Sequence, residues 1–189
     1  MHAKLTQYDY ETPVGQNSRW SIPDGYSFSN EPPIIYTSRF SIEDWCREHG
    51  VYLEYFNHPV IFAEGILYLT CALEGCRSFN QPLEIPDGTL CCTRMLFGCS
   101  QFNQPISIPK SVDRCREMLA FCKKFNHEII LHDNIEDCEY MLNGCTEFNQ
   151  DIEIPYYIPK CKGILNGCWS LTKTVKYEGY CDIGKPDPM

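Results

Sequence analysis

The sequence predicts an α/β solenoid, a stack of short parallel strands and short helices preceded by an N-terminal cap. The main observation is a repeat of constant length: the word Phe79-Asn80-Gln81-Pro82 returns in full or degenerate form every 23 residues, at Phe102, Phe125 and Phe148. Three further columns keep this interval. They are the cysteines Cys76, Cys99, Cys122, Cys145 and Cys168, the cysteines Cys92, Cys115, Cys138 and Cys161, and the leucines Leu73, Leu96, Leu119, Leu142 and Leu165. Self-similarity at such a period is typical of stacked repeats.

The chain divides into three predicted parts. Residues 1–55 do not repeat, and we expect them to cap the open end of the solenoid, because a terminal repeat would otherwise expose its core. Within this cap, residues 41–49 are predicted to form a helix that buries Ile42, Trp45 and Cys46 on one face. The repeats occupy residues 56–177, and residues 178–189 are predicted to be a loose C-terminal tail.

Each repeat is expected to hold one strand and one short helix. An apolar-x-apolar triplet supplies the strand. Because successive side chains of a strand point to opposite faces, the first and third residues should point into the core and the middle residue into solvent. The triplets are residues 60–62, 83–85, 106–108, 129–131, 152–154 and 175–177. The helix is exemplified by residues 111–119, where Val112, Cys115 and Leu119 recur at helical spacing.

The repeat resembles the BspA-like, Treponema-type branch of the leucine-rich repeat family. Residues 106–112 read Ile-Ser-Ile-Pro-Lys-Ser-Val, and the later Gly-Cys-x-x-Leu or Gly-Cys-x-x-Phe return is similar to that family's unit. The Phe-Asn-Gln-Pro motif also looks like motifs of related bacterial and phage repeats. The resemblance implies binding of a protein or another ligand, on cell surfaces, on virions or inside cells, and it transfers no catalytic residue.

Composition narrows the partner classes. The formal net charge is −9, which argues against direct nucleic-acid binding because phosphate contacts need patches of Lys and Arg. The charge fits a protein partner with a basic surface, although it also serves solubility alone. No apolar run approaches the roughly 20 residues of a membrane helix, so we predict no membrane partner.

The thirteen cysteines are predicted to be reduced. Side chains in one column of stacked strands lie about 4.8 Å apart, which exceeds the Cβ separation of about 3.5–4.5 Å that a disulfide prefers. The N-terminal residues also lack the apolar core of a secretory signal. These observations favour a reducing compartment, the cytoplasm, or the host cytoplasm if a phage encodes the chain.

Catalytic and metal sites have weak support. A cysteine nucleophile with a nearby acid or base could be Cys91-Cys92 with Asp87, or Cys122 with His127, but column membership explains Cys92 and Cys122 as core residues. No Cys-x-x-Cys pair or histidine spacing predicts zinc. We therefore predict no enzyme, no catalytic residue, no cofactor and no metal.

The candidate binding residues are the middle positions of the triplets. The residue type at these positions varies between repeats, while the flanking residues stay apolar. The positions can therefore be interpreted either as a binding face or as an ordinary solvated surface. They are Ile61, Glu84, Ser107, Ile130, Glu153 and Lys176. The asparagine column (Asn57, Asn80, Asn103, Asn126, Asn149) could form a recognition ladder, but bonding of its amides to neighbouring backbone is the favoured interpretation.

The leading functional hypothesis is a non-enzymatic protein-binding module that uses the solenoid face and the N-terminal region. A second hypothesis is a phage-encoded acidic inhibitor of a host nuclease or other defence protein, of the anti-CRISPR type. A third is a virion or surface adhesin. The sequence alone does not choose among their partners.

Overall fold

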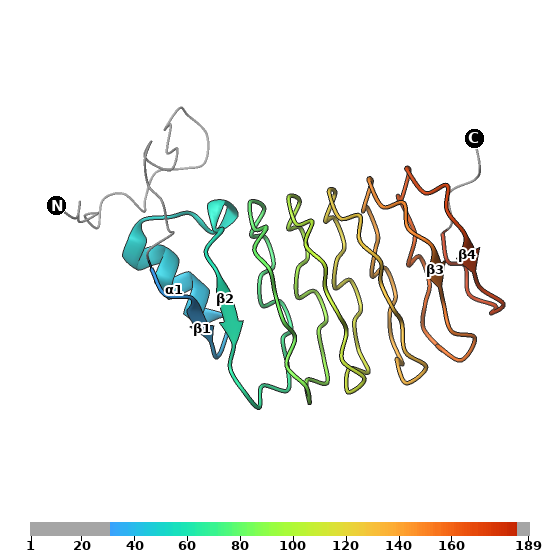
Figure 1. Cartoon of the computed structure of the whole chain (residues 1–189), viewed down its shortest axis with the longest axis horizontal. Helices are drawn as coiled ribbons and strands as arrows, with labels where there is room; N and C mark the ends of the chain where they lie inside the picture. Colours follow the sequence, from blue (N-terminus) through green and yellow to red (C-terminus); the bar gives the residue numbers. More distant parts are fainter. Residues whose placement is uncertain (1–30, 185–189) are drawn as a thin grey trace.

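The computed structural model describes residues 31–184, so the first thirty residues of the predicted cap lie outside the described residues. Its elements in chain order are β1 (Ile34–Tyr36), α1 (Phe40–His49), the 3-10 helix η3 (Leu53–Tyr55), β2 (Val60–Phe62), β3 (Ile152–Glu153) and β4 (Val175–Lys176). β1 pairs in parallel with β2, and β3 pairs in parallel with β4. Between β2 and β3 the chain passes through successive coils that lie side by side along the long axis of the molecule (Figure 1).

Neighbouring coils are joined along one side by a parallel ladder with the 23-residue interval. Its bridges are Tyr68↔Cys91, Cys91↔Arg114, Arg114↔Asp137 and Asp137↔Lys160. Alternate N–H groups donate to the next coil, as Leu96 does to the carbonyl of Met118 at 2.9 Å. The N–H groups between them donate within their own coil, as Met95 does to the carbonyl of Cys92 at 3.0 Å. We call residues 68–75 and their equivalents the hydrogen-bonded side.

The short helices predicted for the repeats do not form in the described residues, and segments such as 111–119 are consecutive turns. At least two residues in each coil adopt a left-handed backbone that an α-helix excludes, for example Arg94 at φ 55° and Glu117 at φ 52°. Their N–H groups also point to the next coil rather than along their own. The prediction was wrong because tandem turns bury residues at the same three- and four-residue spacing as a helix.

Five of the six triplets alternate in burial as predicted, with the middle residue exposed and its neighbours buried. In the sixth, Val175 and Tyr177 beside exposed Lys176 are half-buried. Three of the six, however, do not pair as strands: residues 83–85, 106–108 and 129–131 contain none of β1 to β4. The phenylalanine column explains why these triplets do not form strands. Phe56, Phe79, Phe102, Phe125 and Phe148 stack with nearly parallel rings at 6.0–6.2 Å between centroids. Rings at this distance hold neighbouring coils further apart than the 4.7–4.9 Å that separates paired strands, so the triplets beside the rings do not pair.

Strands form where this ring stack ends. Beyond Phe148 the next member of the column is Leu171, and there β3 and β4 approach closely enough for Ile152 N–H to donate to Thr174 O at 2.9 Å. At the other end, α1 covers the stack, because Trp45 packs edge-on against Phe56 at 5.4 Å. The α1 helix confirms the predicted cap helix, and Ile42 and Cys46 are its buried residues.

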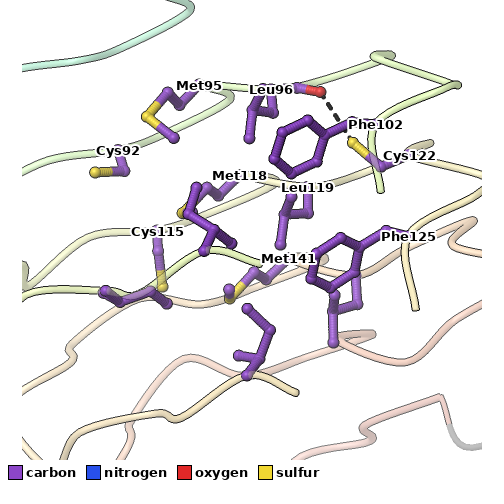
Figure 2. Packing of buried hydrophobic residues seen from close by; sticks show 14 of the residues in the cluster. Cys92, Met95, Leu96, Phe102, Cys115, Met118, Leu119, Cys122, Phe125 and Met141 are labelled. Carbon is purple, nitrogen blue, oxygen red and sulfur yellow. Dashed lines mark hydrogen bonds between the residues drawn. The ribbon is translucent and has the colours of Figure 1, made fainter. Parts of the chain in front are cut away.

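The core is a set of side-chain columns running through the coils. Figure 2 shows Met95, Met118 and Met141 beside Leu96 and Leu119, with Phe102 and Phe125 next to them. All of these side chains are fully buried. The stack continues into the predicted tail, because Gly163 N–H donates to Asp182 O at 2.7 Å and Leu165 N–H donates to Ile183 O at 2.9 Å.

Candidate functional site

All six predicted binding residues are exposed and form one row across the stack, from Ile61 in β2 to Lys176 in β4. Because β1 pairs with β2 in the register Ile35↔Ile61, Ile35 extends this row by one residue. We call these seven residues the outward row. Sequence reasoning missed Ile35 because it precedes the repeats, although its triplet Ile34-Ile35-Tyr36 has the same apolar pattern as Val60-Ile61-Phe62.

A groove of about 460 Å³ crosses three adjacent coils at the C-terminal end of the outward row. Its lining includes Ile130, Glu153 and Lys176, so the structure brings together half of the predicted set in one depression. Ile61, Glu84 and Ser107 are not among the residues that line it. The rest of its lining comes from residues 128, 129, 131, 151, 152, 155 and 174.

The groove carries more negative than positive side chains. Glu128, Asp151 and Glu153 supply three carboxylates against one ammonium from Lys176, which leaves a formal charge of −2. Lys176 Nζ lies 3.3 Å from Glu153 Oε2, but both side chains are about 70% exposed, so this pair adds little stability. The backbone N–H of Thr174 donates to Asp151 Oδ1 at 2.7 Å and lowers the pKa of that carboxyl. Asp151 is therefore an anion at neutral pH.

Three tyrosines form an exposed cluster directly after the groove. The rings of Tyr156 and Tyr157 are 5.3 Å apart, and Tyr180 lies 6.3 Å from Tyr156. Their exposed fractions are 51%, 76% and 93% in the order Tyr156, Tyr157 and Tyr180. We call them the tyrosine cluster. Exposed aromatic side chains are enriched in protein interfaces because they offer a large, stiff contact area.

Sequence reasoning missed the tyrosine cluster, although one signal could have found it. Two coils earlier, the positions of Tyr156 and Tyr157 hold Lys110 and Ser111, so two aromatic residues replace polar ones at one place in the repeat. The participation of Tyr180 could not be read from the repeat, because it lies beyond the regular coils.

The asparagine column is structural, as the favoured interpretation predicted. Each side-chain oxygen accepts a hydrogen bond from the backbone N–H of the residue 23 positions later, at 2.8–3.0 Å. The pairs are Asn57 with Asn80, Asn80 with Asn103, Asn103 with Asn126, Asn126 with Asn149, and Asn149 with Thr172. These amides are used to join coils, so they are poor candidates for ligand recognition.

Four of the five cysteines in the first column also bond between coils. The Cys122 thiol donates to the carbonyl of Leu96 at 3.2 Å (Figure 2), and Cys99, Cys145 and Cys168 make the equivalent bond. Burial raises the pKa of the Cys122 thiol well above its ordinary value. His127 Nε2 lies 3.0 Å from the carbonyl of Asn103, so the proposed pair of Cys122 and His127 is not assembled.

The other cysteine considered as a nucleophile, Cys91 beside Cys92, has hydroxyl groups as its neighbours. Cys91 Sγ lies 3.3 Å from the hydroxyl of Thr93 and 3.5 Å from that of Thr70. Burial raises the pKa of Cys91, but these hydrogen bonds outweigh burial and lower it overall. All thirteen cysteines are free thiols. Across residues 31–184, no three His, Cys, Asp or Glu side chains are grouped as metal ligands. In the same range, no helix has the length and apolar character that crossing a membrane requires.

Comparison with known proteins bears on the central coils. No curated protein and no solved structure gave a significant match to the chain. One protein-family model matches residues 69–158, which include four of the five stacked phenylalanines and most of the hydrogen-bonded side. Over these residues the chain is similar to a family described as Mycoplasma protein of unknown function, DUF285.

Proposed function

We propose that this protein is a non-enzymatic protein-binding module, a leucine-rich-repeat-like solenoid that contacts its partner through the outward row and the N-terminal region. The observation that carries the proposal is the exposure of Ile35, Ile61 and Ile130, at 55%, 51% and 64%. Ile35 and Ile61 are paired across β1 and β2, and adjacent exposed apolar side chains are typical of interaction surfaces.

The scaffold beneath the row supports this proposal. The buried phenylalanine stack and the asparagine bonds hold each coil at a fixed distance from the next. A surface that is already ordered loses little conformational freedom when a partner binds, so more of the contact energy appears as affinity. The solenoid would therefore present its variable row as a stiff, preformed face.

The partner and compartment follow from charge and thiol chemistry. A net charge of −9 favours a partner with a basic surface rather than nucleic acid. Eleven of the thirteen free cysteines are buried, which favours a reducing compartment, the cytoplasm, over the surface of a cell or virion. The similarity to DUF285 adds no activity to this proposal, because that family's function is unknown.

A second candidate function is occupation of a basic, nucleic-acid-binding site on a host defence protein, as in a phage-encoded inhibitor. Exposed Glu84 and Glu153 on the outward row favour it, since carboxylates can contact the Arg and Lys side chains that otherwise bind phosphate. Binding by charge mimicry would weaken steeply between about 0.05 and 0.2 M salt. Binding by the apolar row would change little over that range.

Photo-crosslinking tests the proposed function. A benzophenone amino acid would replace Ile61 or Ile130 on the outward row, or Arg114 on the hydrogen-bonded side as a control, in the full chain inside its native cell. Both row positions should capture the same protein, and the purified pair should bind less tightly after Ile130→Asp. Capture from Arg114 alone, or unchanged binding by the Ile130→Asp variant, would contradict the proposal.

A further inference from the structure

We infer that the groove and the tyrosine cluster together form a docking site for an extended basic peptide segment of a partner protein. This inference rests on the proposed binding function and deepens it, because it places the main contact at the C-terminal end of the outward row. Three features of the described residues carry it: the shape of the groove, the aromatic residues beside it, and its charge.

The shape suits a short extended chain segment. The groove of about 460 Å³ holds a few side chains, and its lining comes from three coils in succession. Ile130 is 64% exposed here, although its neighbours Ile129 and Leu131 are buried. An extended peptide lying across the coils would cover Ile130 and remove this apolar surface from water.

The tyrosine cluster extends the apolar contact beyond the groove. Pro155 lines the groove, and Tyr156 and Tyr157 follow it directly in the chain. Tyr180 packs against Tyr156 although it is 93% exposed, so the three rings stand together in solvent. Tyrosine contributes contact area at low cost in side-chain entropy, and each hydroxyl can still bond to a peptide backbone.

The charge selects the occupant. Lys176 is matched by Glu153 at 3.3 Å, which leaves the carboxylates of Glu128 and Asp151 as the excess charge of the lining. Thr174 donates to Asp151 through its backbone N–H and its side chain, and a carboxylate has about four acceptor sites, so sites remain for a cation. A Lys or Arg side chain complements these groups, whereas an acidic peptide would be repelled.

The probe for the test is a library of random dodecapeptides displayed on phage, selected on the full chain under reducing conditions at about 0.15 M salt. Selected peptides would be synthesised with a fluorescent label and their Kd measured by anisotropy. We expect them to carry net positive charge with at least one large apolar residue, and to bind in the micromolar range, roughly 1–100 µM.

Matched variants locate the binding. Tyr157→Ala and Glu128→Lys should each raise the Kd at least about tenfold, because both remove a direct contact. Tyr68→Ala and Glu136→Lys are the controls: both residues are exposed, and neither lines the groove or belongs to the outward row or the tyrosine cluster. They should change the Kd less than about twofold. All four sites are exposed, so the variants are expected to fold, which urea unfolding would verify.

Three outcomes would overturn the inference: no enriched peptide, an acidic or uncharged consensus, or a Kd that the groove variants leave unchanged. Its failure is distinguishable from failure of the proposed function. If a partner is captured from Ile61 and Ile130 but its binding tolerates Tyr157→Ala and Glu128→Lys, the proposed function holds and the docking site is wrong. If no partner depends on the outward row, both fail.

Discussion

Replacing Phe102 with alanine is the most direct test of how the coils are held together. Phe102 is fully buried and stacks between Phe79 and Phe125, with its ring centroid 6.1 Å from each. If the ring stack sets the spacing of the coils, removing one ring from its middle should destabilise the whole repeat region rather than one loop.

The expected cost follows from burial and the two ring contacts. Truncating a buried phenylalanine to alanine costs about 3–5 kcal/mol, because apolar contacts are lost and a cavity remains. Each aromatic pair contributes about 0.5–1.5 kcal/mol of such a cost. With a ring on both faces, Phe102→Ala should fall in the upper part of that range, about 4–5 kcal/mol. That is a large share of the roughly 5–15 kcal/mol that stabilises a domain.

Phe148 provides a matched control within the same column. It is equally buried, but within the described residues it stacks on one ring only, Phe125 at 6.2 Å, since Leu171 occupies the next position. Phe148→Ala should therefore cost about 0.5–1.5 kcal/mol less than Phe102→Ala. Its place near the end of the stack works in the same direction, because terminal repeats contribute fewer neighbour contacts.

Urea unfolding at 25 °C under reducing conditions, followed by circular dichroism and by tryptophan fluorescence, measures both costs. The midpoint should shift with little change in the slope m, because the area exposed on unfolding is nearly the same. A cost for Phe102→Ala below about 2 kcal/mol, or one no larger than that of Phe148→Ala, would refute the reasoning that the stack supports the fold.

Three further predictions concern the polar and thiol groups. Asn126→Ala should cost about 0.5–1.5 kcal/mol in urea unfolding, because the N–H of Asn149 loses its acceptor in a solvent-exposed hydrogen bond. Asn126→Asp keeps an acceptor oxygen and should cost less; equal costs would contradict this role of the side-chain oxygen. Cys181 should react first in a thiol titration of the native protein, because it is half-buried and hydrogen bonding with Cys161 lowers its pKa. A fast phase that persists in the Cys181→Ser variant would refute this. Arg94 lowers the pKa of Glu74 through a hydrogen bond, so this ion pair stabilises the fold above the ordinary pKa of 4.5, and the stabilisation is lost as pH falls through the lower pKa of the folded state. The loss of stability caused by Arg94→Met should therefore shrink on acidification. A loss that does not depend on pH would argue against the pair.

Much of the burial pattern could be predicted from sequence. Identical residues at a constant interval must occupy equivalent environments in a stack, so the burial of Phe102, Cys115 and Leu119 followed from their columns. The exposure of Ser107 followed from alternation within its triplet. The cap helix could also be predicted, because residues 41–49 have an apolar face and are followed by Gly50, which adopts the left-handed conformation that ends α1.

The predictions of helix and strand within the coils failed for a physical reason that the pattern does not contain. A buried residue every three or four positions is compatible with a helix and with tandem turns. The left-handed backbone of Glu117 and the bond from its N–H to Glu139 decide for turns, and both depend on the neighbouring coil. Strand pairing of the triplets similarly depends on the distance between coils, which residues 83–85 do not set by themselves.

The candidate site divides in the same way. The sequence determined the outward row, because alternation within each triplet is a local property of an extended chain. It did not determine the groove, which requires Ile130, Glu153 and Lys176 from three coils to surround one depression. It also did not determine the tyrosine cluster, since Tyr180 reaches Tyr156 only after the chain has passed the last regular coil.

By itself, then, the sequence determined the 23-residue period, the buried columns and the residues that face solvent. Only the tertiary structure decided which side of each coil carries the backbone ladder. The reason is that two interactions favour different separations between coils. Backbone hydrogen bonds bring neighbouring coils close together on one side, whereas the stacked rings, with centroids 6.0–6.2 Å apart, keep the coils further apart near the triplets. Strand spacing returns at β3 and β4, where Leu171 ends the ring stack, and the groove lies across these same coils.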